Sequence, residues 1–198
     1  MPHRLISLFT AALFVISSAT TALAGQVTIK GAHLCCGACQ TRAEKALAGI
    51  PGLTKASVDR NSKVISFMAA NTKAVTAGIA SLAKSGFYGA AIHEKKAVPF
   101  PATGAKKNVR GEAHTLRGVH LCCDACVVGA QKAVETVQGL QAIEIDRKLR
   151  TVKLIGKEIS LAESIKALQK AGFYAHVRIC LLYTSDAADE RSSVDLGG

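Results

Sequence analysis

The sequence H-L-C-C-G-A-C at residues 33–39 occurs a second time as H-L-C-C-D-A-C at residues 120–126. Six of the seven positions are identical, and the two copies are offset by 87 residues. With one residue of slippage, the same offset also aligns the triplet G-F-Y at 86–88 with that at 172–174. This self-similarity indicates an internal duplication, so the chain contains two copies of a unit of about 65 residues, and both copies are expected to have the same fold.

Within each copy, the spacing of apolar residues switches between the period of a strand and that of a helix. Alternation predicts strands, in the first copy at 27–29, 56–58, 65–67 and 87–92. Helical spacing predicts one helix directly after the cysteines and a second over about 75–82. The second copy repeats this order, βαββαβ, which is typical of an α+β ferredoxin-like sandwich with two helices on one face of an antiparallel sheet.

The repeat therefore predicts two tandem ferredoxin-like domains, at 26–92 and 114–178. Between them, residues 93–113 contain two prolines and lose the apolar periodicity. Such a composition favours a flexible linker, and we expect it to let the domains move relative to each other.

The two ends of the chain have a different character. Residues 1–24 combine an early arginine, an apolar stretch and the small-residue site A-L-A, which predicts a cleaved signal peptide and a periplasmic or secreted protein. Residues 179–198 continue no upstream pattern and resemble translated adapter sequence, so we expect this tail to be non-native and assign Cys180 no role.

The composition is that of a globular protein, with 49% hydrophobic and 20% charged residues among 198. The net charge of +11 is spread along the chain without a block of consecutive basic residues, and aromatic residues make up only 5%. Both features argue against nucleic-acid binding. No apolar run reaches the roughly 18 residues of a membrane-spanning helix, so we expect no membrane insertion after signal cleavage.

The cysteines are the residues that can carry chemistry. Six of the seven fall in the two motifs, where Cys36 with Cys39, and Cys123 with Cys126, form C-x-x-C at the predicted start of a helix. Backbone N–H groups and the positive end of the helix dipole stabilise thiolates at that position. Thiolates prefer soft or borderline metal ions over hard ions such as Mg(II) or Ca(II).

Each copy resembles the heavy-metal-associated domain, which is found in copper chaperones, in the amino-terminal regions of metal-transporting P-type ATPases and in the periplasmic mercury-binding protein. Members of that family carry G-M-T-C-x-x-C between the first strand and the first helix of the same fold, and a late glycine followed by an aromatic residue. The resemblance covers nearly all of 27–92 and 114–177. It implies metal binding by the two C-x-x-C pairs, with a metal-transporting membrane protein as a partner.

Both copies depart from the family where it has Gly-Met-Thr, because this chain has His33-Leu34-Cys35 and His120-Leu121-Cys122 there. The extra thiol and imidazole can complete a Cys₃His set for Zn(II), or a three-thiolate site for Cd(II) or Hg(II). We therefore expect Cu(I) or Zn(II) first, with Hg(II) and Cd(II) as alternatives. Adjacent cysteines in extended chain point to opposite sides, so Cys35 joins Cys36 only if the chain turns between them. Each histidine is otherwise typical of a surface residue at a strand end.

Three functions fit these residues. The first is a soft-metal carrier outside the cytoplasm, either a metallochaperone or a sequestering protein with one C-C-x-x-C site in each of two domains. The second is thiol–disulfide redox work, because C-x-x-C at a helix start is also the arrangement of oxidoreductases. The third is a structural role for the cysteines. The sequence contains no Trp and no hydrolase or nucleotide-binding motif, so we do not expect an enzyme.

Overall fold

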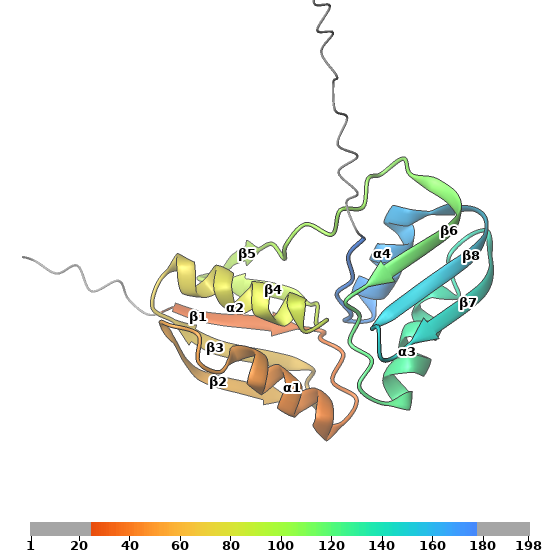
Figure 1. Cartoon of the computed structure of the whole chain (residues 1–198). Coiled ribbons are helices and arrows are strands. Elements are labelled where there is room, and N and C mark those ends of the chain that lie inside the picture. Colours follow the sequence, from red (N-terminus) through yellow and green to blue (C-terminus); the bar gives the residue numbers. More distant parts are fainter. Residues whose placement is uncertain (1–24, 178–198) are drawn as a thin grey trace, which may run out of the picture.

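The computed structural model describes residues 25–177. The predicted signal peptide, the predicted non-native tail and Cys180 lie outside the described residues. The described chain is α+β and forms two domains that lie side by side, each with two helices packed on an antiparallel sheet (Figure 1).

The first domain has the predicted element order followed by one additional strand. Its elements are β1 (Gly25–Lys30), α1 (Gly37–Leu47), β2 (Leu53–Asp59), β3 (Val64–Ala69), α2 (Thr72–Lys84), β4 (Ala90–His93) and β5 (Lys96–Val98). The sheet order is β2-β3-β1-β4-β5, and every neighbouring pair is antiparallel. The first four strands thus have the ferredoxin-like order, which confirms the predicted fold class.

The second domain repeats this arrangement but lacks a full fourth strand. Its elements are β6 (Arg110–Arg117), α3 (Asp124–Val134), β7 (Leu140–Asp146), β8 (Thr151–Ser160) and α4 (Leu161–Lys170), with sheet order β6-β8-β7. The strand predicted at 173–177 is reduced to a single bridge between Arg117 and His176. On either side of this bridge, the N–H of Tyr174 donates to the carbonyl of Gly86 and that of Val177 to the carbonyl of Thr103, so other segments hold the chain here as well as β6.

The connecting segment 93–113, for which the sequence predicts a flexible linker, contains β5 and the first residues of β6. Strand β5 extends the first sheet by pairing with β4. Further along, the Phe100 ring lies 4.9 Å from that of Tyr88, and the Tyr174 hydroxyl donates to the carbonyls of Pro101 and Ala102. The segment is therefore attached to both domains.

Alternating burial explains why the sheets form. In the first domain Val27, Ile29, Ile65 and Phe67 are at most 1% exposed and line one face of neighbouring strands. Burial of side chains of this size stabilises a fold by about 1.5–3 kcal/mol each. The buried apolar residues of the two domains form one continuous cluster, so the domains share a core instead of standing apart.

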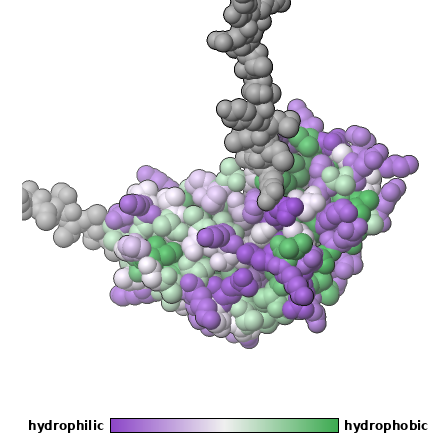
Figure 2. All heavy atoms as spheres, in the orientation of Figure 1, coloured by the Kyte–Doolittle hydropathy of each residue, from purple (hydrophilic) through white to green (hydrophobic). Residues whose placement is uncertain are grey.

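The space-filling view shows one face of the molecule. In Figure 2, hydrophilic side chains spread over the visible face of both domains, with smaller apolar areas between them. Among residues 25–177, no helix is long and apolar enough to cross a membrane.

The repeated G-F-Y triplets join the two domains. Phe87 and Phe173 form an antiparallel bridge, and the N–H of Tyr88 donates to the carbonyl of Gly172 over 3.0 Å. In the reciprocal bond the N–H of Tyr174 donates to the carbonyl of Gly86 over 2.9 Å. This exchange places equivalent segments of the two repeats face to face, with the cysteine loops beside them.

Candidate metal centre

The two cysteine motifs lie at the starts of α1 and α3, and the two loops that precede these helices approach each other between the domains (Figure 1). Cys36 and Cys123 are the N-cap residues, and Cys39 and Cys126 are the third residues of the helices. The N–H of Cys39 donates to the Cys36 carbonyl over 3.1 Å, and that of Cys126 donates to the Cys123 carbonyl over the same distance. Both helix N-termini therefore direct their positive dipole ends toward the sulfurs.

The six sulfurs form one cluster instead of two separate sites. Within the repeats, the Sγ atoms of the C-x-x-C pairs lie 3.5 and 3.6 Å apart. Between the repeats, the Sγ of Cys39 lies 3.5 Å from that of Cys122, and the Sγ of Cys35 lies 3.4 Å from that of Cys126. The sulfurs of one repeat are thus as close to those of the other repeat as to each other.

Burial is graded across the cluster. Cys39 and Cys126 are 0% exposed, Cys36, Cys122 and Cys123 are half-buried, and Cys35 is exposed. All six are free thiols. Two sulfurs are therefore enclosed, while the others border the solvent.

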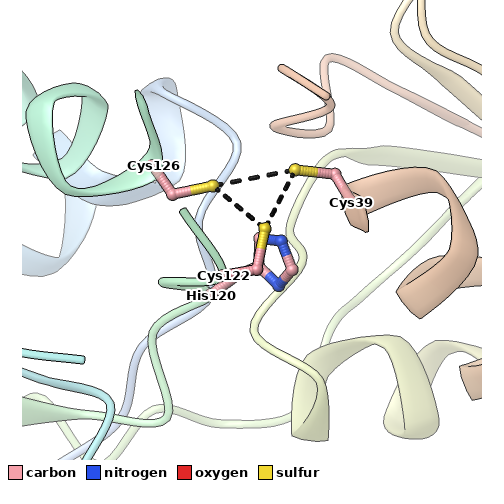
Figure 3. A group of neighbouring side chains, drawn as sticks. All are labelled: Cys39, His120, Cys122 and Cys126. Carbon is pink, nitrogen blue, oxygen red and sulfur yellow. Dashed lines mark hydrogen bonds between the residues drawn. The ribbon is translucent and has the colours of Figure 1, made fainter. Parts of the chain in front are cut away.

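His120 is fully buried, and neither of its ring nitrogens has a hydrogen-bond partner. Figure 3 shows its ring beside Cys122, with Cys39 and Cys126 reaching the same place from the two helices. One ligand atom from each of these four residues lies within 4.8 Å of the others. A buried imidazole without partners costs free energy, and a metal ligand is a common reason for one.

His33 is the equivalent residue of the first repeat, and it is half-buried. Its Nε2 is buried without a partner, and it groups with Cys35 and Cys126. Burial lowers the pKa of His33, against a rise caused by the nearby Cys39. The neutral imidazole that results is the form that ligates metals. The expectation that each histidine is a surface residue is therefore wrong for His120.

Aromatic rings hold both histidines from the opposite domain. The His33 ring stacks on Phe173 with centroids 4.1 Å apart, and the His120 ring lies 4.3 Å from Phe87. A Cβ added at Gly86 would collide with the backbone of Gly118 and His120, and one added at Gly172 would collide with that of Gly31 and His33. Both glycines have positive φ, so only glycine allows the two backbones to come this close.

The thiols are electrostatically coupled. The hydrogen bond from Cys126, helped by that from Cys36 and opposed by burial, lowers the pKa of Cys39 to about 2. The bond to this thiolate, together with burial, raises the pKa of Cys126 far above its usual range. Burial likewise raises the pKa of Cys122, and that of Cys35 to about 12. Several thiolates so close together repel one another, so full ionisation of the cluster requires cations among the sulfurs.

The spacing of the sulfurs suits such cations. Four ligands arranged tetrahedrally with metal–sulfur bonds of about 2.3 Å place their sulfurs about 3.8 Å apart. The Sγ–Sγ contacts in the cluster range from 3.4 to 3.9 Å. The donor set of thiol sulfur and neutral imidazole nitrogen is the one that soft and borderline ions prefer. The clustered cysteines therefore support heavy-metal binding.

The structure brings all eight predicted site residues together, but not as one C-C-x-x-C site in each domain. The difference arises because the G-F-Y triplets dock the domains with their cysteine loops facing each other. Phe87 and Phe173, which contact the two histidines, were not predicted from the sequence as part of the site, and neither were two arginines that bind the second loop. Arg150 donates to the carbonyls of Val119 and Gly118, and also across the interface to that of Lys84. Arg147 donates to the carbonyl of Cys122.

Some of these residues could have been found in the sequence. The G-F-Y triplets recur with the repeat, which marks them as equivalent, although not as partners. The arginines carry no such signal, because nothing in the sequence tells that their guanidinium groups reach the cysteine loop.

No protein-family model matches the chain, and no curated protein matches it. A solved structure of the N-terminal soluble domains of CopA from Bacillus subtilis is similar, with 19% identity over 77% of this chain and 92% of that chain, and a TM-score of 0.29. Another, of the water-soluble region of the P-type ATPase CopA from Bacillus subtilis, has 18% identity over 77% of this chain and 90% of that chain, and a TM-score of 0.30. The ferredoxin-like arrangement of the present chain follows from its own strand order.

Proposed function

We propose that this protein binds soft or borderline metal ions at the interdomain cysteine cluster and carries or sequesters them outside the cytoplasm. In this proposal the metal is cargo and the protein is not an enzyme. Cu(I) and Zn(II) are the first candidates, and Hg(II) and Cd(II) are the alternatives, because all four accept thiolate and imidazole ligands.

The single observation that carries the proposal is the convergence of six thiols and a fully buried, unpartnered imidazole at one place. A structural role for the cysteines does not account for this group, because polar atoms without partners destabilise a core. A metal ion would satisfy the imidazole and neutralise the thiolates together.

The grading of burial supports a role in transfer. The half-buried and exposed cysteines at the border of the cluster are open to an incoming ligand, while Cys39 and Cys126 are enclosed. Exchange of thiolate ligands through such a border would pass the ion to or from a partner. The resemblance to heavy-metal-associated domains makes a metal-transporting membrane protein the partner that we propose, and the signal-like residues 1–24 make the periplasm or the exterior the proposed location.

Anaerobic titration of the reduced chain tests metal binding. Cu(I), Zn(II) and Hg(II) are each added in competition with a chelator of known affinity, and thiolate-to-metal absorbance is recorded. We expect tight binding of at least one of these ions, and full retention of it in the control variant Cys180→Ser. Protein whose thiols have been alkylated should bind none.

Thiol–disulfide exchange is the competing function, since the C-x-x-C sulfurs also lie close enough to form disulfides after small movements. If no ion competes with the chelator, and the chain instead cycles disulfides at a potential that matches an oxidising compartment, the metal proposal is wrong.

A further inference from the structure

We infer that the cluster is a two-metal centre in which the sulfurs of Cys39 and Cys126 each bridge both ions. This inference rests on the proposed metal binding and specifies how the two repeats share it. Each ion would have two bridging sulfurs, one terminal sulfur and one imidazole nitrogen, and neither repeat alone would hold a complete site.

The first ion site is the group drawn in Figure 3. The Sγ atoms of Cys39, Cys122 and Cys126 form a triangle with sides of 3.5, 3.5 and 3.7 Å. A ring nitrogen of His120 lies within 4.8 Å of all three sulfurs. These are three sulfurs and one nitrogen around one point, which is the Cys₃His set of a tetrahedral ion.

The second ion site is the equivalent group when the repeats are exchanged. The Sγ atoms of Cys35, Cys39 and Cys126 form a triangle with sides of 3.4, 3.5 and 3.7 Å. A ring nitrogen of His33 lies within 4.8 Å of the sulfurs of Cys35 and Cys126. The two triangles therefore have nearly the same dimensions.

The triangles share one side, the 3.7 Å contact between Cys39 and Cys126. These two cysteines are equivalent in the repeats, stand at the third position of their helices and are both 0% exposed. A thiolate sulfur has enough lone pairs to bind two ions. Two tetrahedra that share this side use every one of the buried sulfur and nitrogen ligands.

The charge balance favours the same arrangement. Cys35, Cys39, Cys122 and Cys126 supply four negative charges as thiolates, and two divalent ions supply four positive ones. An imidazole that ligates a metal ion is neutral and adds no charge. The loaded centre is thus uncharged, which removes the cost of enclosing an unbalanced charge between the domains.

Cys36 and Cys123 lie outside both triangles. Their sulfurs are 3.7 Å apart, both residues are half-buried, and no histidine joins them. The bridged centre therefore uses only the second cysteine of each C-x-x-C pair, together with the cysteine that precedes the pair. A separate site in each repeat would instead need both members of each pair.

Nuclear magnetic resonance of the full reduced chain loaded with ¹¹³Cd(II) tests the bridging directly. We expect two equivalents of Cd(II), with a ¹¹³Cd–¹¹³Cd scalar coupling that passes through the shared sulfurs. Two bound ions without mutual coupling would overturn the bridged centre while leaving the proposed metal binding intact. No bound Cd(II), Cu(I), Zn(II) or Hg(II) would overturn both.

Matched serine variants give a second test, by Cd(II) competition titration. Cys39→Ser removes a ligand of both ions, so both equivalents should weaken by about 100-fold or more. Cys36→Ser, three residues away in the same motif, should leave both equivalents within about threefold of the unsubstituted chain. The bridged centre is wrong if Cys36→Ser and Cys39→Ser each abolish one equivalent and leave the other unchanged. Circular dichroism of each variant establishes that it is folded.

Discussion

The two repeats carry nearly the same motif but support it differently. In the second repeat, His120 is fully enclosed and Arg150 binds three carbonyls around the loop. In the first repeat, His33 is half-buried, and Lys63, which stands at the position of Arg150, is exposed. The ligands are thus nearly symmetric, whereas the residues that hold them are not.

This difference indicates that duplication supplied the sulfurs and the docking triplets twice, while the arginine hydrogen bonds to the loop carbonyls belong to the second repeat. Substitutions at equivalent positions separate the two contributions. Substitution of a ligand or docking residue that both repeats share should have equal effects in the two repeats. Substitution of an arginine that contacts the loop should have an effect only in the second repeat.

The largest effect is expected at the docking glycines. Gly86→Ala and Gly172→Ala combine an unfavourable positive φ with a backbone collision, so each should lower the free energy of unfolding by about 3 kcal/mol. The control Gly49→Ala also has positive φ but meets nothing within 4 Å, and it should cost only about 1–2 kcal/mol. Urea unfolding followed by circular dichroism measures both. Equal losses in all three variants would contradict the docking role.

A smaller effect is expected from the half-buried Arg150. Arg150→Met leaves the carbonyls of Gly118, Val119 and Lys84 without this donor, and should destabilise the chain by about 2 kcal/mol. Burial and the nearby Arg42 lower the pKa of Arg150. Lys63→Met at the equivalent exposed position should change the stability by less than about 0.5 kcal/mol. Thermal unfolding of the two variants measures the loss of stability. An equal loss in both would contradict the inferred difference between the repeats.

The histidines should show opposite effects on stability and on metal binding. His120→Phe removes two unpartnered buried nitrogens, so the metal-free chain should gain about 1 kcal/mol. The same substitution should weaken Zn(II) binding at least tenfold. His33→Phe should weaken binding similarly but stabilise the metal-free chain less, because His33 is only half-buried. Loss of stability in metal-free His120→Phe, without loss of metal affinity, would indicate a packing role.

The smallest effect is expected at the surface pair Arg147 and Asp124, whose charged atoms lie 2.7 Å apart. The side chains are 47% and 93% exposed, so Arg147→Met should cost less than about 1 kcal/mol, including its bond to the Cys122 carbonyl. Arg60→Met, at the same position in the first repeat, faces Gly37 instead of an aspartate and should cost less still. Denaturant titration at low and high salt should show a salt-dependent difference only for Arg147→Met.

The fold was largely predictable from the sequence, because each repeat has clear strand and helix periods and a helix that starts at the cysteines. The turn between β2 and β3 is stabilised locally, because the Asp59 carboxylate accepts from the N–H of Asn61. The periodicity of apolar residues could not predict which distant segments provide backbone hydrogen-bond partners for a strand. In the second repeat the fourth strand is reduced to the bridge between Arg117 and His176, and the neighbouring N–H groups of Tyr174 and Val177 donate to Gly86 and Thr103, which lie far away in the chain.

The candidate ligands were predictable from their residue types, but their grouping was not. Sequence spacing places Cys36 and Cys39 together, since both lie at the start of one helix. The contacts of Cys39 with Cys122 and Cys126 depend on how the two domains dock, and that follows from backbone hydrogen bonds between the G-F-Y triplets. A repeat pattern reveals that two units are alike, and it does not reveal which surfaces they share.

In this account the two repeats build one two-metal centre between them. X-ray absorption spectroscopy at the zinc edge, on the full chain loaded with two equivalents of Zn(II), tests it most directly. We expect a zinc–zinc distance of about 3 Å, as bonds of about 2.3 Å to two shared sulfurs require, with three sulfurs and one nitrogen around each ion. Zinc surrounded by sulfur and nitrogen alone, with no second zinc nearby, would contradict the claim.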